Sequence, residues 1–371
     1  MRRICCLLER WESGGIESFL YNILARIDLT QLQVDIVASS LGKSVFTKPL
    51  QDLGICFFEL SGSQRKVVEN HRRFRLLARE RRWDVLHLNA FQGLSLYYLR
   101  LAKEAGIPVR IAHSHNTALR KSLTRPLKLA VHRWARRRYM IDATNLWACS
   151  QTAAQFLFNR QELEQKGYTF IPNGIDTARF RFDPVVRECV RGELGLDGKL
   201  VIGNVGRLCD QKNQDFLLDV FAEVLKQRPE SRLLLVGEGE NKPQLERKAQ
   251  KLEVAGKVIF YGVSDHIERL LWAMDVFAFP SLFEGLGIAA VEAQAAGLPV
   301  ACSEYVPEEV RVTEQIQVVP ISNGAKTWAN VVLRSTAANR EVASVSVQNV
   351  GFGIEAVVKE IGSRWYKSAG L

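Results

Sequence analysis

Residues Phe277–Gly297 read FAFPSLFEGLGIAAVEAQAAG, and this stretch decides the class of fold. An apolar strand is expected over Val276–Phe279, followed by a turn at Pro280-Ser281. Glu284 lies in that turn between apolar and glycine residues, and a helix of small side chains opens near Gly287. A strand, a turn with a polar side chain and a helix start form the ligand edge of a doubly wound α/β sheet.

The residues of this turn also indicate what kind of ligand it would take. Gly285 and Gly287 let the backbone approach a ligand closely, and a helix N-terminus presents unpaired amides to an anion. Glu284 is followed eight residues later by Glu292, and a carboxylate accepts hydrogen bonds from hydroxyl groups. We therefore expect a polyol that carries phosphate, with a nucleotide-sugar as the natural candidate.

The composition is that of a soluble globular protein with room for two or three domains, since 47% of the 371 residues are hydrophobic and 24% are charged. No apolar run approaches the ~20 residues that span a bilayer, and Ile4–Leu8 is too short for a signal peptide. The seven cysteines form no metal-binding or disulfide pattern. These features predict a cytoplasmic protein with reduced cysteines and no metal site.

The net charge of +10 is concentrated in the first half of the chain. Residues 1–171 hold 27 Lys and Arg against 14 Asp and Glu, whereas residues 172–371 hold 23 against 26. Most of the excess lies in Gln64–Trp83 and Leu119–Tyr139. The second segment also carries leucines and Trp134, so it could be a basic helix on an anionic membrane or a solvated helix face. No nucleic-acid-binding module accompanies it, and a nucleic-acid partner is not expected.

Strands and helical segments alternate along the whole chain, which is typical of α/β layering. Strand-glycine-helix openings near residues 3–28 and 201–227 predict two Rossmann-like domains that face each other across a cleft. The expected domains are 1–172 and 173–351, and a helix at about 352–371 could pack back on the first. The expected strands are 3–8, 34–38, 56–60, 85–88, 109–112, 146–148, 200–205, 233–236, 258–261, 276–279 and 300–302.

A second chemical motif follows the first strand of the second domain. Arg207 and Lys212 come after Gly206 at the mouth of the next helix. A guanidinium offers two parallel hydrogen bonds and an ammonium a point charge, so together they would form an anion clamp. Such a clamp would stabilise the charge that develops on a departing diphosphate. The alternative is an ordinary surface pair.

Five segments resemble the retaining GT-B glycosyltransferases of family GT4. They are GRLCDQKN at 206–213, LLLVGEGE at 233–240, FPSLFEGLGIAAVEAQAAGLPV at 279–300, SGGIESFLYNILARID at 13–28 and IPNGID at 171–176. The resemblance covers nearly the whole chain and is strongest over 201–302. It points to enzymes that assemble bacterial capsule and exopolysaccharide. Ser303–Glu309 departs from the glycine-rich turn that many relatives have there, which leaves the phosphate contacts of that turn open.

The resemblance implies a role for each residue of the donor site. Glu284 would contact hydroxyls of the donor sugar, and Glu292 would hold the ribose. Arg207 and Lys212 would bind the diphosphate without a metal, and the Gly14-Gly15 amides would approach the same phosphates. Backbone at Leu286 and Gly287 would lie near sugar and diphosphate, and backbone around Val263 would face the base.

The histidines and the remaining acidic residues have simpler explanations beside the functional ones. His115 is expected to face the donor sugar or the acceptor, in preference to His113, although a histidine at a strand end is often only hydrogen-bonded into a loop. His87 lies within a strand and is expected to be structural. Asp265 and Glu268 fit a variant of the capping box, and Ser150 fits a helix N-cap.

The function implied is retaining transfer of a sugar, with a UDP-sugar as the favoured donor. The acceptor would be a hydroxyl, as on a lipid-linked glycan of a bacterial surface polysaccharide. The leaving phosphate would help to deprotonate the acceptor hydroxyl on the same face of the sugar. The alternatives are another GT-B enzyme, such as a nucleotide-sugar 2-epimerase or a phosphorylase, and a non-catalytic binding protein with this fold.

Overall fold

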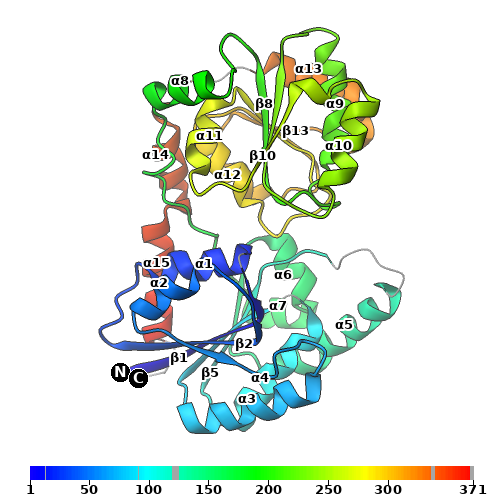
Figure 1. Ribbon diagram of the computed structural model, residues 1–371. Coiled ribbons are helices and arrows are strands. Elements are labelled where there is room, and N and C mark those ends of the chain that lie inside the picture. Colours follow the sequence, from blue (N-terminus) through cyan, green and yellow to red (C-terminus); the bar gives the residue numbers. More distant parts are fainter. Residues whose placement is uncertain (13, 91, 119–124, 336–338, 368–371) are drawn as a thin grey trace. The chain divides into compact units, whose positions relative to one another are not determined.

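The computed structural model describes residues 1–371 except 13, 91, 119–124, 336–338 and 368–371. The chain divides into two units, one formed by Met1–Gly174 with Ile354–Leu371 and the other by Ile175–Gly353. Each unit builds its own parallel sheet flanked by helices (Figure 1). The prediction of two Rossmann-like α/β domains is confirmed.

The sheet of the first unit has the strand order β3-β2-β1-β4-β5-β6-β7 within the described residues, and neighbouring strands run parallel. Burial on both faces explains why β1 reads as an apolar run over residues 4–8 rather than as an alternating strand. The strands are β1 (Arg2–Trp11), β2 (Leu32–Leu41), β3 (Cys56–Glu59), β4 (Val85–Ala90), β5 (Val109–Ser114), β6 (Asn145–Ala148) and β7 (Thr169–Phe170).

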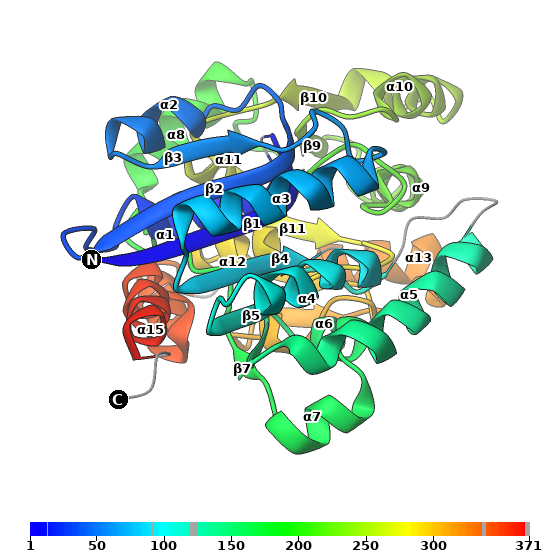
Figure 2. The same ribbon diagram turned by 90° about the horizontal axis from the view of Figure 1, so that it is seen from below.

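The core of the first unit joins the beginning of the chain to its last described helix. Phe19 and Ile23 of helix α1 share one hydrophobic cluster with Ile4 of β1 and with Ile361 and Trp365 of α15. Figure 2 shows α3, α4 and α5 in succession along the same unit, with α4 against β4 and β5. The helices are α1 (Gly15–Leu24), α2 (Thr47–Asp52), α3 (Val67–Arg81), α4 (Tyr97–Glu104), α5 (Arg125–Tyr139), α6 (Gln151–Leu157), α7 (Arg160–Lys166) and α15 (Ile354–Lys367).

The sheet of the second unit has the order β10-β9-β8-β11-β12-β13, again parallel throughout its described strands. The order reverses at β8, which lies between β9 and β11, so the loops after β8 and β11 leave the same edge of the sheet side by side. The strands are β8 (Val201–Val205), β9 (Arg232–Val236), β10 (Val258–Gly262), β11 (Val276–Phe279), β12 (Val300–Cys302) and β13 (Ile316–Val318).

Helix α9 is the centre of the second core. Its Phe221 and Val224 pack with Ile202 of β8, and Phe216 meets Trp328 of α13 edge to face. The helices of this unit are α8 (Pro184–Glu193), α9 (Gln214–Leu225), α10 (Lys242–Lys251), α11 (Ile267–Ala273), α12 (Ile288–Ala295), α13 (Gly324–Arg334) and α14 (Ala343–Val347).

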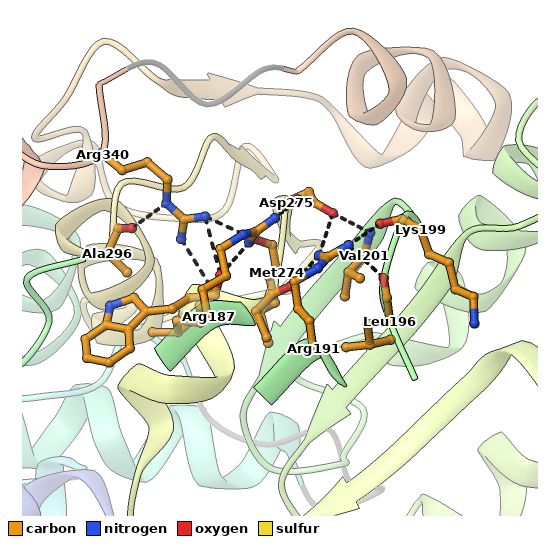
Figure 3. A network of polar contacts seen from close by, with 12 residues as sticks. Arg187, Arg191, Leu196, Lys199, Val201, Met274, Asp275, Ala296 and Arg340 are labelled. Atoms are coloured by element: carbon orange, nitrogen blue, oxygen red, sulfur yellow. Dashed lines mark hydrogen bonds and ion pairs between the residues drawn. The ribbon is translucent and has the colours of Figure 1, made fainter. Parts of the chain in front are cut away.

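A network of arginines around Asp275 fixes the start of β11 (Figure 3). Asp275 accepts hydrogen bonds from Arg187, from Arg191 and from the amide of Val201. Arg340 donates to the carbonyl of Ala296, just after α12, at 3.0 Å. Burial lowers the pKa of Arg340 to about 9, with Arg187 adding to the effect. The network ties α8 and the segment before α14 to the strand that leads into the Glu284 turn.

The strands expected from the sequence are present, together with helix 354–367 and the Ser150 cap, whose hydroxyl accepts from the Ala153 amide at 3.1 Å. Of the expected basic helix, residues 125–139 form α5 and residues 119–124 lie outside the described part of the chain. The capping box at Asp265 and Glu268 is wrong. His266 is the N-cap of α11 and no side chain caps the helix, because Glu268 pairs with Arg179 instead.

Candidate donor site and family

The turn from β11 to α12 places Glu284 in a largely buried position, with 6% of its surface exposed. Gly287 precedes the helix with φ +93°, and a Cβ there would lie 3.2 Å from the ring of Phe279. At the other end Gly297 has φ +73°, so glycines set both ends of the helix. The predicted start and end of this helix agree with the observed bounds of α12.

The loop after β8 meets this turn through several hydrogen bonds. The amide of Leu282 donates to the carbonyl of Gln211 at 2.8 Å, and the Gln211 side chain donates to the carbonyl of Phe283 at 2.9 Å. Asn213 Nδ2 donates to the carbonyl of Pro280 at 3.1 Å. These bonds lock the two loops into one edge of the sheet.

Lys212 and Glu284 form an ion pair at the centre of this edge. Lys212 Nζ lies 2.7 Å from Glu284 Oε1 and 4.8 Å from the centroid of the Phe279 ring. Their side chains are 17% and 7% exposed, so both charges are largely removed from water. The sequence assigned them to different parts of a donor, the diphosphate and the sugar. The structure joins them to each other.

Arg207 lies at the same edge but has a different environment. It is exposed, and its guanidinium makes no hydrogen bond or ion pair within the described residues. Its backbone is fixed, because its carbonyl accepts from Gln214 Nε2 at 3.1 Å. The preceding Gly206 is so close to Gly237 that a Cβ on Gly237 would lie 2.2 Å from the Gly206 carbonyl oxygen. A rigid backbone therefore presents a guanidinium that is available to an anion.

Glu292 lies on the second turn of α12 and is partly buried. Burial raises the pKa of its carboxyl to about 7, Arg179 and Lys212 oppose that rise, and Glu268 adds to it. No hydrogen bond to this carboxylate occurs among the described residues. Glu292 is therefore a carboxylate at the edge of its ionisation range, with acceptor capacity left for a ligand.

The remaining donor residues predicted in this unit differ in exposure. Val263 follows β10 at the carboxyl edge of the sheet and is 73% exposed. The side chain of Leu286 is buried, as the packing of the Glu284 turn requires. The structure thus brings Arg207, Lys212, Glu284 and Glu292 to one region of the second unit.

In the first unit, Gly14 and Gly15 open helix α1 as predicted. The space beside Gly14 is occupied by Glu17, because a Cβ on Gly14 would lie 2.7 Å from Glu17 Oε2. Burial raises the pKa of the Glu17 carboxyl, while backbone amides at Glu17, Glu12 and Gly14 lower it by donating to it. Of the two amides expected to meet phosphate, that of Gly14 therefore donates to the Glu17 carboxylate in the structure.

His115 follows β5 and is partly buried, while His113 is completely buried in the strand. The Nε2–H of His115 donates to Asn89 Oδ1 at 2.9 Å, and burial lowers the pKa of His115 to about 3. His113 and His87 share a hydrogen bond of 3.0 Å in the core. His115 is therefore neutral at pH 7 and can act as a hydrogen-bond partner rather than as a cation. The sequence did not show that the three histidines form one cluster, since strand positions alone do not give ring contacts.

The two basic segments contribute differently to the surface. On α3, Arg72 and Arg73 pair with Glu69. On α5, His132 and Ala135 are buried and most other described side chains point outward, including Leu127 at 69% and Trp134 at 54% exposed. Helix α5 thus presents arginines and large apolar side chains together. None of the helices in the described residues has the length and apolar character needed to cross a membrane.

Comparison with known proteins identifies the family. The model of "Glycosyltransferase Family 4" matches residues 13–179, and that of "Glycosyl transferases group 1" matches residues 186–327. EpsF of Bacillus subtilis, named as a glycosyltransferase, is 30% identical over 346 residues, which cover 91% of this chain and 89% of EpsF.

Two further proteins are similar to this chain. The UDP-Gal:alpha-D-GlcNAc-diphosphoundecaprenol alpha-1,3-galactosyltransferase of Escherichia coli is 26% identical over 71% of this chain and 68% of its own length. Anabaena HepE, solved with UDP-glucose, superposes with a TM-score of 0.79 at 21% identity, over 99% of this chain and 100% of HepE. The chain therefore belongs to the family 4 (group 1) glycosyltransferases and has the GT-B fold.

Proposed function

We propose that the protein transfers a sugar from a UDP-sugar to a hydroxyl group of a lipid-linked glycan, with retention of configuration and without a divalent metal. The observation that carries this proposal is the edge of the second sheet, where an available Arg207 lies beside the buried Lys212–Glu284 pair. HepE was solved with UDP-glucose, and the E. coli relative is named for a diphosphoundecaprenol acceptor. The product class that we propose is a bacterial surface polysaccharide.

In the proposed reaction the acceptor oxygen bonds to the anomeric carbon while the bond from that carbon to the diphosphate oxygen breaks. The acceptor proton passes to the leaving phosphate on the same face of the sugar. Arg207 stabilises the negative charge that develops on the diphosphate, and Lys212 adds a second positive charge. The Glu284 carboxylate accepts hydrogen bonds from hydroxyls of the sugar, and its ion pair orients Lys212 at the same time. The Glu292 carboxylate accepts hydrogen bonds from the ribose hydroxyls.

A thermal-shift screen of UDP-, GDP-, ADP- and dTDP-sugars tests the choice of donor. A ligand at ~100 times its dissociation constant should stabilise the fold by about 2.7 kcal/mol. We expect the largest shift with a UDP-sugar, and a larger shift with a GDP-sugar would overturn the uridine assignment.

Incubation of the donor without acceptor separates a transferase from a 2-epimerase, since an epimerase would convert the sugar.

Replacement of Arg207 tests the diphosphate clamp. Arg207→Ala should lower kcat about 10²- to 10³-fold, which is typical for loss of one donor to a developing charge. The melting temperature should not change, because the guanidinium is exposed. Arg228→Ala, an exposed arginine in the same unit, is the matched control. Transfer at the normal rate by Arg207→Ala would show that the clamp is elsewhere.

Two further assays test the rest of the proposal. Nuclear magnetic resonance of the product determines its anomeric configuration and so tests retention. Activity in the presence of a metal chelator tests metal independence.

The basic face of α5 would hold the enzyme at the cytoplasmic surface of an anionic membrane. Each Lys or Arg near such a surface contributes about 1 kcal/mol, and exposed Trp134 and Leu127 could enter the headgroup region. Sedimentation with anionic and neutral vesicles should show binding to anionic vesicles, weakened by Arg133→Gln/Arg137→Gln. Arg228→Gln/Arg247→Gln removes the same charge from exposed positions of the second unit and should leave binding unchanged. Equal binding to both vesicle types would exclude this role.

A further inference from the structure

Gln211 and Asn213 flank Lys212 in the loop after β8, and both side chains bond to the backbone of the turn after β11. Gln211 Nε2 donates to the carbonyl of Phe283 at 2.9 Å, and Asn213 Nδ2 donates to the carbonyl of Pro280 at 3.1 Å. Both carbonyls follow the end of β11, so each needs a hydrogen-bond partner from outside the strand ladder. Two side-chain amides, one on each side of the lysine in the sequence, thus hold the turn in place.

Gln211 also reaches the carboxylate that Lys212 binds. Its Nε2 lies 3.5 Å from Glu284 Oε2, while Lys212 Nζ lies 2.7 Å from the other oxygen, Oε1. An amide nitrogen carries two hydrogens, so Gln211 can donate to the Phe283 carbonyl and to Glu284 together. The longer contact is the weaker hydrogen bond, yet it restricts rotation of the carboxylate. Adjacent residues of one loop therefore hold the two oxygens of Glu284.

Asn213 fixes the backbone that follows Lys212. It is the N-cap of α9 and has φ +56° and ψ +38°, a left-handed conformation that asparagine adopts more readily than most residues do. The stem of Lys212 passes close to Gly206, where a Cβ would lie 3.1 Å from Lys212 Cε. The left-handed residue after the lysine and the glycine beside its stem together constrain the course of this side chain.

We propose that Gln211 and Asn213 are positioning residues of the donor site, which hold Glu284 where it meets the donor sugar while Lys212 meets the diphosphate. The inference rests on the proposed function, in which Glu284 accepts hydrogen bonds from sugar hydroxyls. Neither amide needs to touch the donor, because each acts through the turn or through the carboxylate. Their loss should therefore weaken binding of the sugar much more than binding of the nucleotide, since the backbone of Arg207 is fixed separately.

Two substitutions remove these donors with little other change. Gln211→Met has a similar length and volume but no N–H to donate. Asn213→Gly keeps the positive φ without strain, so it removes the hydrogen bond to Pro280 alone. Alanine at position 213 would add backbone strain to the lost hydrogen bond. Asn213→Gly also serves if Gln211→Met does not fold.

The experiment is calorimetric titration with UDP-glucose and with UDP, because only the first probe carries the sugar hydroxyls. We expect Gln211→Met to bind UDP-glucose about three- to tenfold more weakly than the wild type, as for the loss of roughly one hydrogen bond. Its affinity for UDP should stay unchanged, and Asn213→Gly should show the same selectivity. Gln227→Met is the matched control, because it removes an exposed amide of the same unit that bonds to Asn330. It should leave both affinities as they are.

A double-mutant cycle separates positioning from a general structural effect. If Gln211 acts through Glu284, Gln211→Met should have no further effect on UDP-glucose in a Glu284→Ala background. In an Arg207→Ala background it should keep its full effect, because the two residues are then independent. An equal loss of affinity for UDP and UDP-glucose, or a full additional loss in the Glu284→Ala background, would overturn the inference.

The proposed function fails in a different way. If the wild type does not bind UDP-glucose, the donor assignment falls, and this inference falls with it. If Glu284→Ala weakens UDP as much as UDP-glucose, the sugar role of Glu284 is wrong. A selective loss in Glu284→Ala, together with wild-type affinities in Gln211→Met and Asn213→Gly, would overturn only the positioning role.

Discussion

The Lys212–Glu284 ion pair joins two residues that are 72 positions apart in the sequence. Their presence at one sheet edge could be predicted, because each follows a strand and the carboxyl ends of neighbouring parallel strands meet. Their direct contact could not, since the spacing of residues along a strand does not determine where long side chains end. The same holds for Glu17, whose carboxylate folds back onto the amides at the start of α1.

Replacing only one partner of this ion pair should destabilise the protein more than replacing both partners by uncharged residues. Lys212→Met leaves the largely buried Glu284 without its cation and should lower the free energy of unfolding by roughly 3 kcal/mol. Lys212→Met/Glu284→Gln should cost clearly less, because no buried charge is left unpaired. Urea denaturation at pH 7 measures both. Equal losses in the single and double variants would mean that the pair is effectively solvated.

Glu292 should make the stability of the second unit depend on pH. Its folded pKa of about 7 is above the ordinary value of 4.5, so the folded state holds its proton more tightly than the unfolded state. Its contribution is fully present below about pH 4.5 and is lost as pH rises through 7, a difference of roughly 3 kcal/mol. Denaturant titrations of wild type and Glu292→Gln over this range should show that decline only in the wild type. Parallel curves would contradict the assignment.

Helix α12 shows which elements the sequence can specify. Gly287 and Gly297 mark its ends because both have positive φ, and Pro299 follows the second. The short edge strands β7 and β13 were not predicted, since β7 has only two residues and β13 has Gln317 between its two apolar residues, so neither contains an apolar run. The wrong cap of α11 has a different cause. A capping box involves residues close together in the sequence, whereas Glu268 is bonded to Arg179, which is 89 residues away.

The glycine after α12 should tolerate a side chain less well than the glycine after α8. A Cβ on Gly297 would lie 2.6 Å from Arg340, while one on Gly195 would have no atom within 4 Å. Both have positive φ, of +73° and +63°. Gly195→Ala should therefore cost roughly 1 kcal/mol from backbone strain alone. Gly297→Ala should cost about 2 to 4 kcal/mol, because overpacking is added. Chemical denaturation of the two variants compares them, and equal losses would show that the Arg340 segment moves aside freely.

At the scale of the whole molecule, each unit has its own core with a fully buried tryptophan. Trp365 of α15 belongs to the core of the first unit, and Trp328 of α13 belongs to that of the second. The doubled strand-glycine-helix pattern in the sequence predicts two such sheets. The pairing of α15 with α1 is beyond a sequence argument, because an amphipathic helix fits any complementary apolar face.

Replacement of Trp365 and of Trp328 should affect separate unfolding transitions. Replacing either by Ala removes a large buried side chain and should cost about 3 to 5 kcal/mol. In differential scanning calorimetry, Trp365→Ala should lower the transition of the first unit and Trp328→Ala that of the second. A single transition that both variants lower equally would show that the units unfold as one.

Acid should destabilise the first unit. Burial lowers the pKa of His87 and of His115 to about 3 and that of His113 well below its ordinary value of 6.5. These histidines take up protons more readily when unfolded, so their contribution is present above pH 6.5 and is lost as pH falls toward 3. Calorimetry at decreasing pH should show the first-unit transition falling below pH 6.5, while Glu292 acts in the opposite direction on the second. A first-unit transition that does not change with pH would contradict the neutral state of the cluster.

The return of the chain at Ile354 has a consequence for synthesis on the ribosome. All of Ile175–Gly353 leaves the exit tunnel before α15 does, so the second unit can fold while the first still lacks Ile361 and Trp365. Until then the apolar face of α1 that these residues cover stays open to water and to chaperones. We expect nascent chains that end at residue 353, held on the ribosome by a linker long enough to clear the exit tunnel, to protect the second unit from protease and to leave the first one sensitive.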